Sequence, residues 1–248
     1  MRNEPAAGGE EVAMLTHPLL TVPWHAASRR GPRQINADAT ATYHDPDTGR
    51  SAFVVADGVG DTWAAASAAQ LAAGIAARAA VSVGPAQAVL AAQRTLLAEG
   101  PDDGDTVLVV AVPGRYSCDV AWVGDCRAYQ SNGRVLEQIT VDHTVAEYYR
   151  AREQPVTPRM AHLVTTSVRT VRPDRIGSTR TSLAAGRLLL CSDGVHRTLT
   201  CTDIRTILDG PKPAEQLVDA ALGFGGRDNS TALVVEHTLP TEPQTLAA

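Results

Sequence analysis

The sequence is poor in lysine, cysteine and aromatic residues. Lys212 is the only lysine among 22 basic side chains, and 27 acidic side chains bring the net charge to -5. This balance argues against a surface that binds nucleic acid and against a polybasic membrane anchor. The four cysteines form no Cys-x-x-Cys pair, and we expect free thiols in a reducing cytoplasm.

Long hydrophobic runs are also missing. Residues 1–11 are polar and acidic, unlike a signal peptide. The longest weakly apolar stretch, 63–83, is mostly alanine and contains Gln70 and Arg78, so we expect a soluble core helix. No composition break marks a second domain. We expect a flexible leader over 1–18, one domain over 19–237 and a disordered tail over 238–248.

Short strands and paired helices alternate along this domain. The patterns predict a strand over 19–27 that starts an antiparallel meander, and a hairpin whose turn is Asp45–Gly49. Helices are predicted over 62–80, with Asp61 as its cap, and over 85–99. Further strands are predicted over 106–112, 119–123, 128–131, 134–140, 188–192 and 230–236, and further helices over 144–152, 202–208 and 213–222. The fold class is therefore α+β, with two central antiparallel sheets between outer helices, a four-layer αββα sandwich.

Three carboxylates stand at or beside the ends of predicted strands. Asp57-Gly58 ends one apolar run, Asp193-Gly194 ends another, and Asp228 precedes the last strand. Asp-Gly alone is a turn signal, and we interpret Asp103-Gly104 and Asp209-Gly210 as turns. Several carboxylates aimed at one point repel each other unless a cation compensates them, and oxygen ligands favour Mg²⁺ or Mn²⁺ over zinc.

The ordered motifs resemble the metal-dependent serine/threonine protein phosphatases of the PPM, or type 2C, family in its bacterial form. The resemblance covers about residues 20–236, in the family's order. The motifs that carry it are Arg33-x-x-Asn36-x-Asp38, Ala56-Asp57-Gly58-Val-Gly60, Val123-Gly124-Asp125-Cys-Arg127, Asp142-His143, Cys191-Ser-Asp193-Gly194 and Arg227-Asp228-Asn229-Ser-Thr231.

The resemblance implies hydrolysis of phosphoserine and phosphothreonine by a metal-activated water, with two core Mg²⁺ or Mn²⁺ ions. Asp57 would bridge the ions, the Gly58 carbonyl would contact the second ion, and Asp193 and Asp228 would hold the first. Arg33 would bind the substrate phosphate. Asp125 would help hold a third, weaker ion. The catalytic set is thus Arg33, Asp57, Asp193 and Asp228, with Asn36, Asn229 and His143 in support, and the segment 143–162 is the variable flap.

Two positions depart from the family's pattern. Ala37 stands where a glutamate usually serves the second ion, and Val59 stands where many members have a histidine. Asp38 would be an outer or weak ligand, although neighbouring strand residues face opposite ways. We therefore expect weak binding of the second ion and a need for plentiful Mn²⁺.

Some of these residues have simpler interpretations. Arg33 and Asp125 could be ordinary turn residues, His143 could have a structural role, and Cys191 is interpreted as a core thiol rather than a nucleophile. Two other functions stay open: a degenerate phosphatase fold that binds phosphoproteins or a regulator, and a hydrolase of small phosphate esters. The expected partners are phosphorylated proteins of a bacterial serine/threonine kinase pathway, acted on by a cytoplasmic monomer without nucleic acid or membrane.

Overall fold

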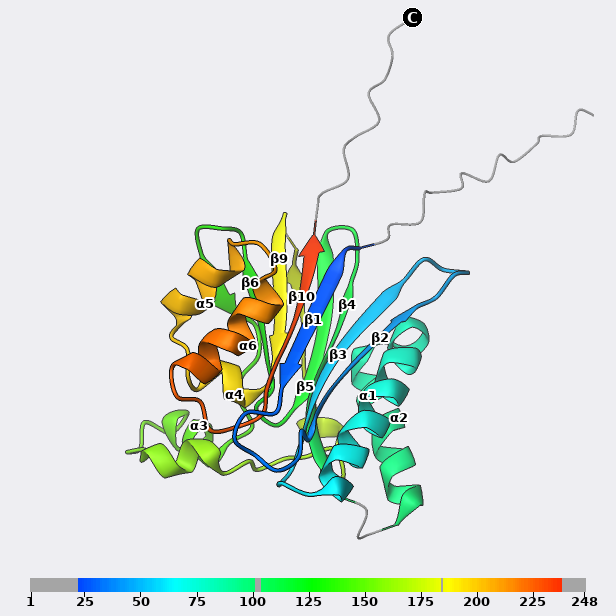
Figure 1. The fold of residues 1–248 in the computed structure, drawn as a ribbon. Coiled ribbons are helices and arrows are strands. Elements are labelled where there is room, and N and C mark those ends of the chain that lie inside the picture. The colour runs from blue at the N-terminus through cyan, green and yellow to red at the C-terminus, as the bar shows by residue number, and fades with distance from the viewer. Residues whose placement is uncertain (1–21, 101–103, 184, 238–248) are drawn as a thin grey trace, which may run out of the picture.

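The computed structural model describes residues 22–100, 104–183 and 185–237. The leader expected over 1–18 and the tail expected over 238–248 lie outside these ranges. Within them the chain forms ten strands and six α-helices, arranged as the sequence predicts in two central sheets with helices outside (Figure 1).

Each sheet has five antiparallel strands. The first has the order β1-β10-β9-β6-β7. Its strands are β1 (Trp24–Arg29), β6 (Arg127–Ser131), β7 (Leu136–Gln138), β9 (Gly186–Cys191) and β10 (Ser230–His237). The second has the order β2-β3-β4-β5-β8. Its strands are β2 (Asp38–His44), β3 (Ser51–Gly58), β4 (Thr106–Pro113), β5 (Ser117–Val123) and β8 (Gly177–Ser182).

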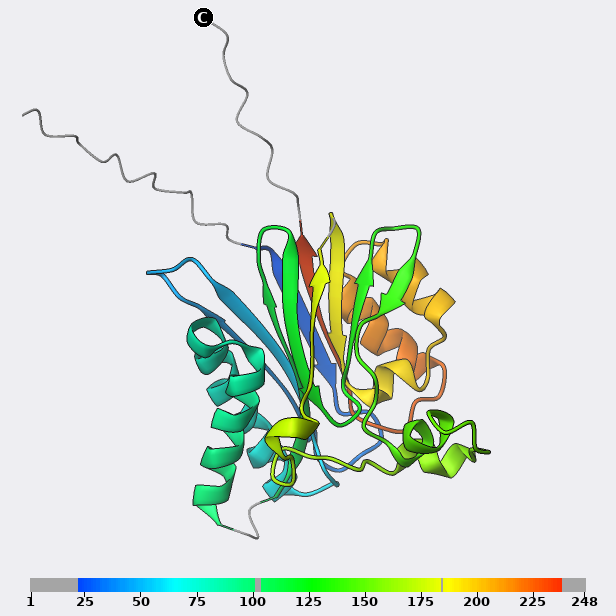
Figure 2. The same ribbon diagram turned by 180° about the vertical axis from the view of Figure 1, so that it is seen from behind.

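Helices cover the outer face of each sheet, which gives the four layers (Figures 1 and 2). The long helices α1 (Trp63–Val83) and α2 (Pro85–Glu99) pack on the second sheet, chiefly on β2, β3 and β4. The helices α4 (Asp193–His196), α5 (Cys201–Leu208) and α6 (Pro213–Gly223) share a core with the first sheet. The helix α3 (Val145–Arg150) and the short 3₁₀ helix η1 (Pro158–His162) lie beyond the sheet edge.

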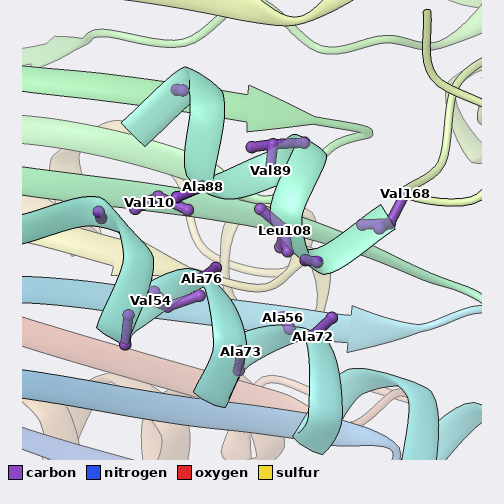
Figure 3. Packing of buried hydrophobic residues seen from close by; sticks show 14 of the residues in the cluster. Val54, Ala56, Ala72, Ala73, Ala76, Ala88, Val89, Leu108, Val110 and Val168 are labelled. Atoms are coloured by element: carbon purple, nitrogen blue, oxygen red, sulfur yellow. The ribbon is translucent and has the colours of Figure 1, made fainter. Parts of the chain in front are cut away.

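The alternation of side chains along a strand divides the core into layers. On β3, Phe53 and Val55 point into the space between the sheets, whereas Val54 and Ala56 face the helices. The helix side is filled by small residues, because α1 buries a face of alanines that lets the helix lie close to the sheet (Figure 3). Both faces of β3 are therefore buried. Residue 57, the next one on the same face as Val55, also points into the space between the sheets.

The helix α1 is the only one in the described ranges that is long and apolar enough to cross a membrane. Over half of its most apolar window, 56%, is buried inside the molecule. Its contacts with β2, β3 and α2 make it a core helix, as its alanine-rich sequence predicts.

The structure corrects several predicted elements. β1 pairs with β10 and not with β2, so the N-terminal meander is wrong, although the β2–β3 hairpin is confirmed. β8 was not predicted, because its sequence is polar and largely exposed at a sheet edge. The N-cap of α1 is Thr62, whose hydroxyl accepts from the Ala65 amide. The Asp61 carboxylate instead accepts from the amides of Gln34 and Ile35.

Candidate metal centre and phosphate site

The acidic residues predicted as site residues converge on one edge of the sandwich. β10 is antiparallel to β9, so Asp193, just after β9, and Asp228, just before β10, lie at the same edge. β3 is antiparallel to β2, so Asp57 near the end of β3 lies opposite Asp38 at the start of β2. Asp125 occupies the turn between β5 and β6, which joins the two sheets at this edge.

Asp38 and Asp57 face the space between the sheets. Asp57 lies two residues after Val55 and therefore shares its face, and Asp38 is its direct cross-strand partner. The Asp38 Oδ2 atom accepts a hydrogen bond of 2.7 Å from the hydroxyl of Ser192, the residue that follows β9. This bond connects the two sheets at the carboxylate cluster.

Ala37 faces the opposite way. Its side chain is 1% exposed and packs with Ala65 and Ala66 at the first turn of α1. Residue 37 thus points toward the helix layer, whereas the neighbouring Asp38 points toward the carboxylates.

Arg197 links the other two buried carboxylates. Its Nη2 atom lies 2.5 Å from Asp125 Oδ2, and its Nη1 atom lies 2.7 Å from Asp193 Oδ2. Asp125 is 2% exposed and Asp193 is 8% exposed, so both ion pairs are largely removed from water. One guanidinium therefore neutralises charge on two buried carboxylates from different sheets and turns.

Arg33 and Asp228 lie on the solvent side of the same cleft. The Arg33 Nη2 atom is 2.7 Å from Asp228 Oδ2, and both side chains are 37% exposed. The loop that carries Arg33 is fastened by Asn229, whose Oδ1 accepts from the Ala37 amide while its Nδ2 donates to the carbonyls of Arg30 and Ile35. The side chain of Asn229 therefore holds the loop of Arg33, and its supporting role at the site stays a prediction.

Both glycines that follow the strand-end aspartates lie where a side chain would collide. A Cβ atom on Gly58 would lie 2.5 Å from the Ala65 carbonyl oxygen. A Cβ atom on Gly194 would lie 1.9 Å from the Asn229 carbonyl oxygen. The two Asp-Gly pairs are therefore places of close backbone approach and not only turns.

Burial shifts the acid–base behaviour of the cluster. Desolvation raises the pKa of Asp38 and of Asp125 to about 7, with repulsion from Asp193 adding to each. The pKa of Asp57 rises well above its ordinary value, first through burial and then through repulsion from four other aspartates. Burial also raises the pKa of Asp193, against the opposing effect of Arg197. The protein alone leaves this cluster short of positive charge.

The donor set fits hard divalent cations, although no group of three or more His, Cys, Asp or Glu side chains in the described ranges already has metal-binding geometry. The Oδ1 atoms of Asp38 and Asp193 are buried and make no hydrogen bond. Unpartnered carboxylate oxygens are costly inside a protein, and Mg²⁺ or Mn²⁺ is the kind of ion that such oxygens bind. The residues present therefore suit these ions.

A cleft of about 220 Å³ opens over the cluster. Its walls include Asp57, Gly58, Asp125, Asp193, Arg197, Arg33, Asp228, Asn229, Val59 and His162. A second cleft of about 360 Å³ shares Arg33, His162, Asp193, Arg197 and Asp228 and extends to Arg227. His162 belongs to η1, so the flap predicted over 143–162 does border the site.

The remaining predicted residues have structural contacts. Asn36 donates to the Ser28 hydroxyl and accepts from the Asp38 amide, which fixes the start of β2. His143 accepts from the Gly124 amide through Nδ1, beside the turn that carries Asp125, and burial lowers its pKa. Cys191 is fully buried in the core, which fits the core-thiol interpretation.

Sequence reasoning did not find Arg197. The available signal was its position four residues after Asp193, a spacing that brings two side chains together on a helix. Its other partners, Asp125 and the flap, are distant in the sequence and follow only from the fold.

Several solved structures with this architecture are bacterial phosphatases. The crystal structure of the Mycobacterium tuberculosis serine/threonine phosphatase PstP/Ppp superposes with a TM-score of 0.74 at 26% identity, over 87% of this chain and 98% of that one. The PstP catalytic domain in complex with two manganese ions gives a TM-score of 0.71 at 26% identity, over 87% and 97%.

Sequence relatives point to the same class. The serine/threonine phosphatase stp of Listeria monocytogenes serotype 4b is 31% identical over 144 residues, which is 54% of this chain. The match spans 57% of the Listeria protein, so the chain covers little more than half the length of this relative. No protein-family model matches the chain. By fold, and by sequence over about half of its length, the chain is similar to bacterial serine/threonine phosphatases.

Proposed function

We propose that this chain is a metal-dependent phosphatase that hydrolyses phosphoserine and phosphothreonine in proteins. The observation that carries the proposal is the cleft itself, whose walls bring Asp57, Asp125, Asp193 and Asp228 together with Arg33 and Arg197. The buried Asp38 lies opposite Asp57 at the same edge. The relatives are phosphatases of this fold, and one of them binds two manganese ions.

The carboxylates would hold two Mg²⁺ or Mn²⁺ ions. Asp57 and the Gly58 carbonyl, together with Asp193 and Asp228, are the proposed ligands, and Asp38 supports them from its place opposite Asp57. When bound, such ions supply Lewis acidity that activates water and offsets negative charge on phosphate oxygens. A third, weaker ion at Asp125 would have to share that carboxylate with Arg197.

Arg33 is suited to bind the substrate phosphate. One of its nitrogens pairs with Asp228, and the partly exposed guanidinium keeps other N–H donors directed at solvent in the cleft. A planar fork of donors can meet two phosphate oxygens at once, which orients the ester and neutralises charge that grows in the transition state. Asn229 holds the loop that carries Arg33, so it preserves this orientation.

The proposed substrates are phosphorylated proteins of a bacterial serine/threonine kinase pathway. The chain would act as a monomer in the cytoplasm, without nucleic acid or membrane. The partly open cleft beside the flap leaves room for a side-chain phosphate together with part of its peptide.

The test compares hydrolysis of an aryl phosphate and of a phosphothreonine peptide, with and without Mn²⁺. We expect metal-dependent turnover of both substrates, and an Asp193→Asn variant should lose at least about a hundredfold in kcat, as expected when preorganised charge is removed. Asp209→Asn is the matched control, because it alters an Asp-Gly pair that is exposed outside the cleft. Turnover that survives Asp193→Asn or needs no metal would contradict the proposal.

The same assays distinguish two alternative functions. Binding of the phosphopeptide without turnover would favour a phosphoprotein-binding module, and turnover of the aryl ester alone would favour a hydrolase of small phosphate esters.

The position of Ala37 leads to a separate prediction. In EDTA, Ala37→Glu should lower the stability by about 1–3 kcal/mol, because added volume and charge enter the buried cluster beside α1. Thr40→Glu, at an exposed position of β2, is the control and should leave the melting temperature nearly unchanged. Weak binding of the second ion stays a prediction, which Mn²⁺ titration of Ala37→Glu tests. If the variant binds Mn²⁺ no more tightly and turns over no faster than wild type, residue 37 is not the position of a missing ligand.

A further inference from the structure

Arg197 is the most highly connected cation of the site. It follows α4, and its side chain is only 22% exposed. Besides its ion pairs with Asp125 and Asp193, its Nη2 atom donates to the Ala161 carbonyl at 2.7 Å. Its Nη1 atom lies 2.5 Å from His162 Nδ1. The same guanidinium therefore contacts both the carboxylate cluster and the flap.

The space between Asp125 and Asp193 requires positive charge. Both carboxylates are buried and come from separate turns, so their charges repel each other at short range in a poorly solvated place. A divalent ion or a guanidinium can satisfy this need. An arginine remains protonated at any working pH, and it repels a metal ion that approaches the same two oxygens.

We propose that Arg197 is a built-in cation of this centre, which excludes a divalent ion from between Asp125 and Asp193 and fastens the flap over the cleft. The proposal rests on the proposed metal centre but concerns a different pair of carboxylates. The two core ions are held by Asp57, Asp193 and Asp228, and Asp193 offers them its unpartnered Oδ1 while Oδ2 stays with Arg197. The chain then binds two ions, and Asp125 holds an arginine instead of a third ion.

The flap contact gives the proposal a second consequence. The η1 turn is attached to the carboxylate cluster through Ala161 and His162, and both attachments are made to Arg197. Its removal leaves η1 held by its contacts with α3 and by the pairing of Thr144 with Val164. Cleavage by trypsin after Arg159, within η1, should therefore become several-fold faster.

The decisive experiment counts bound Mn²⁺ by equilibrium dialysis and elemental analysis of the full chain. Wild type should bind two ions, Arg197→Gln should bind one more, and Arg197→Lys should stay at two because it keeps the charge. The double variant Arg197→Gln with Asp125→Asn should return to two. Arg205→Gln, at an arginine of α5 that bonds to the Arg134 carbonyl outside the cleft, is the control and should also bind two.

Asp125→Asn in the wild-type background tests the same point if Arg197→Gln does not fold. Its Mn²⁺ count should stay at two, whereas loss of one ion would show that Asp125 holds metal and would overturn the proposal. A third ion in wild type, or no gain in a folded Arg197→Gln protein, would also overturn it. If wild type binds no Mn²⁺, the proposed metal centre fails as well. If every variant except Asp193→Asn binds two ions, the proposed metal centre is supported and the proposed role of Arg197 is wrong.

Discussion

At the scale of single residues, the site depends on where a side chain is absent as much as on where one is present. Gly194 lets the first turn of α4 lie against the backbone of Asn229, which places Asp193 beside Asp228. The glycine therefore sets the distance between two of the proposed metal ligands.

A Gly194→Ala substitution should separate these two segments. The added Cβ would lie 1.9 Å from the Asn229 carbonyl oxygen, so we expect a loss of stability of about 1–3 kcal/mol and a large loss of metal-dependent turnover. Gly223→Ala is the control, because no atom lies within 4 Å of a Cβ there and the residue ends α6. Melting temperature and kcat/KM measure both effects. Wild-type turnover in Gly194→Ala would contradict this role.

The individual site residues could largely be predicted from the sequence, because each follows or precedes a recognisable strand. Asp57, Asp193 and Asp228 are at the expected edge, and Asp38 and Asp125 join them there. Arg197 could not be predicted in the same way, because its contacts with Asp125 and Ala161 join residues 72 and 36 positions apart, respectively. Local patterns carry no information about such pairs.

At the scale of elements, the loop between β1 and β2 carries Arg33, the proposed phosphate-binding residue, without a helix or strand of its own. It is fixed at three backbone positions by the side chain of Asn229, which lies at the start of another strand. The conformation of this loop therefore depends on hydrogen bonds from a residue outside the loop, Asn229.

An Asn229→Ala substitution should release the loop. Loss of these hydrogen bonds leaves buried backbone groups without partners, which should cost about 1–3 kcal/mol and raise KM for a phosphopeptide. Asn132→Ala is the control: it removes two hydrogen bonds from an exposed hairpin, so it should affect stability only. Comparing KM and melting temperature separates the two variants. An equal change in KM for both would contradict the proposed support of Arg33.

Elements with an apolar pattern were predicted well, and those without one were not. The helix α2 begins and ends at the expected residues, because Pro85 and Gly100 mark its boundaries. β8 has no apolar alternation and is held at the sheet edge by its pairing with β5. The strand predicted over 19–27 overlaps β1 only in part. β1 also lies in the sheet of β10 and not in the sheet of β2, because its place depends on pairing with β10, which its own sequence does not encode.

At the scale of the whole molecule, the carboxylate cluster makes stability depend on pH and metal. Asp38 and Asp125 have a folded-state pKa of about 7, so their contribution to stability is present below about pH 3.8 and is lost as pH rises through about 7. The pKa of Asp57 is also raised, so its contribution to stability has the same sign. His196 acts in the opposite direction, because burial lowers its pKa to about 3 and acid favours the unfolded chain. The three carboxylates outweigh it.

The metal-free protein should therefore melt at a lower temperature at pH 8 than at pH 5.5. The steepest change is expected at about pH 5–6, between the ordinary and the raised pKa values of Asp38 and Asp125. There each proton that the folded chain binds and the unfolded chain does not alters the free energy of unfolding by about 1.4 kcal/mol per pH unit. Mn²⁺ should restore more stability at pH 8, because it binds the deprotonated carboxylates. Thermal melts in EDTA and in Mn²⁺ measure this, with Asp57→Asn flattening the pH dependence and Asp47→Asn leaving it unchanged. A melting temperature in EDTA that rises toward pH 8 would contradict the prediction.

The place of β10 in the sheet also determines when, during synthesis, the proposed metal centre can form. This last strand lies between β1 and β9, and the turn just before it supplies Asp228 and Asn229. A nascent chain whose final segment is still inside the ribosome lacks both an interior strand of one sheet and a proposed ligand of the first ion. We therefore expect the proposed metal centre to be complete only after β10 has paired with β1 and β9.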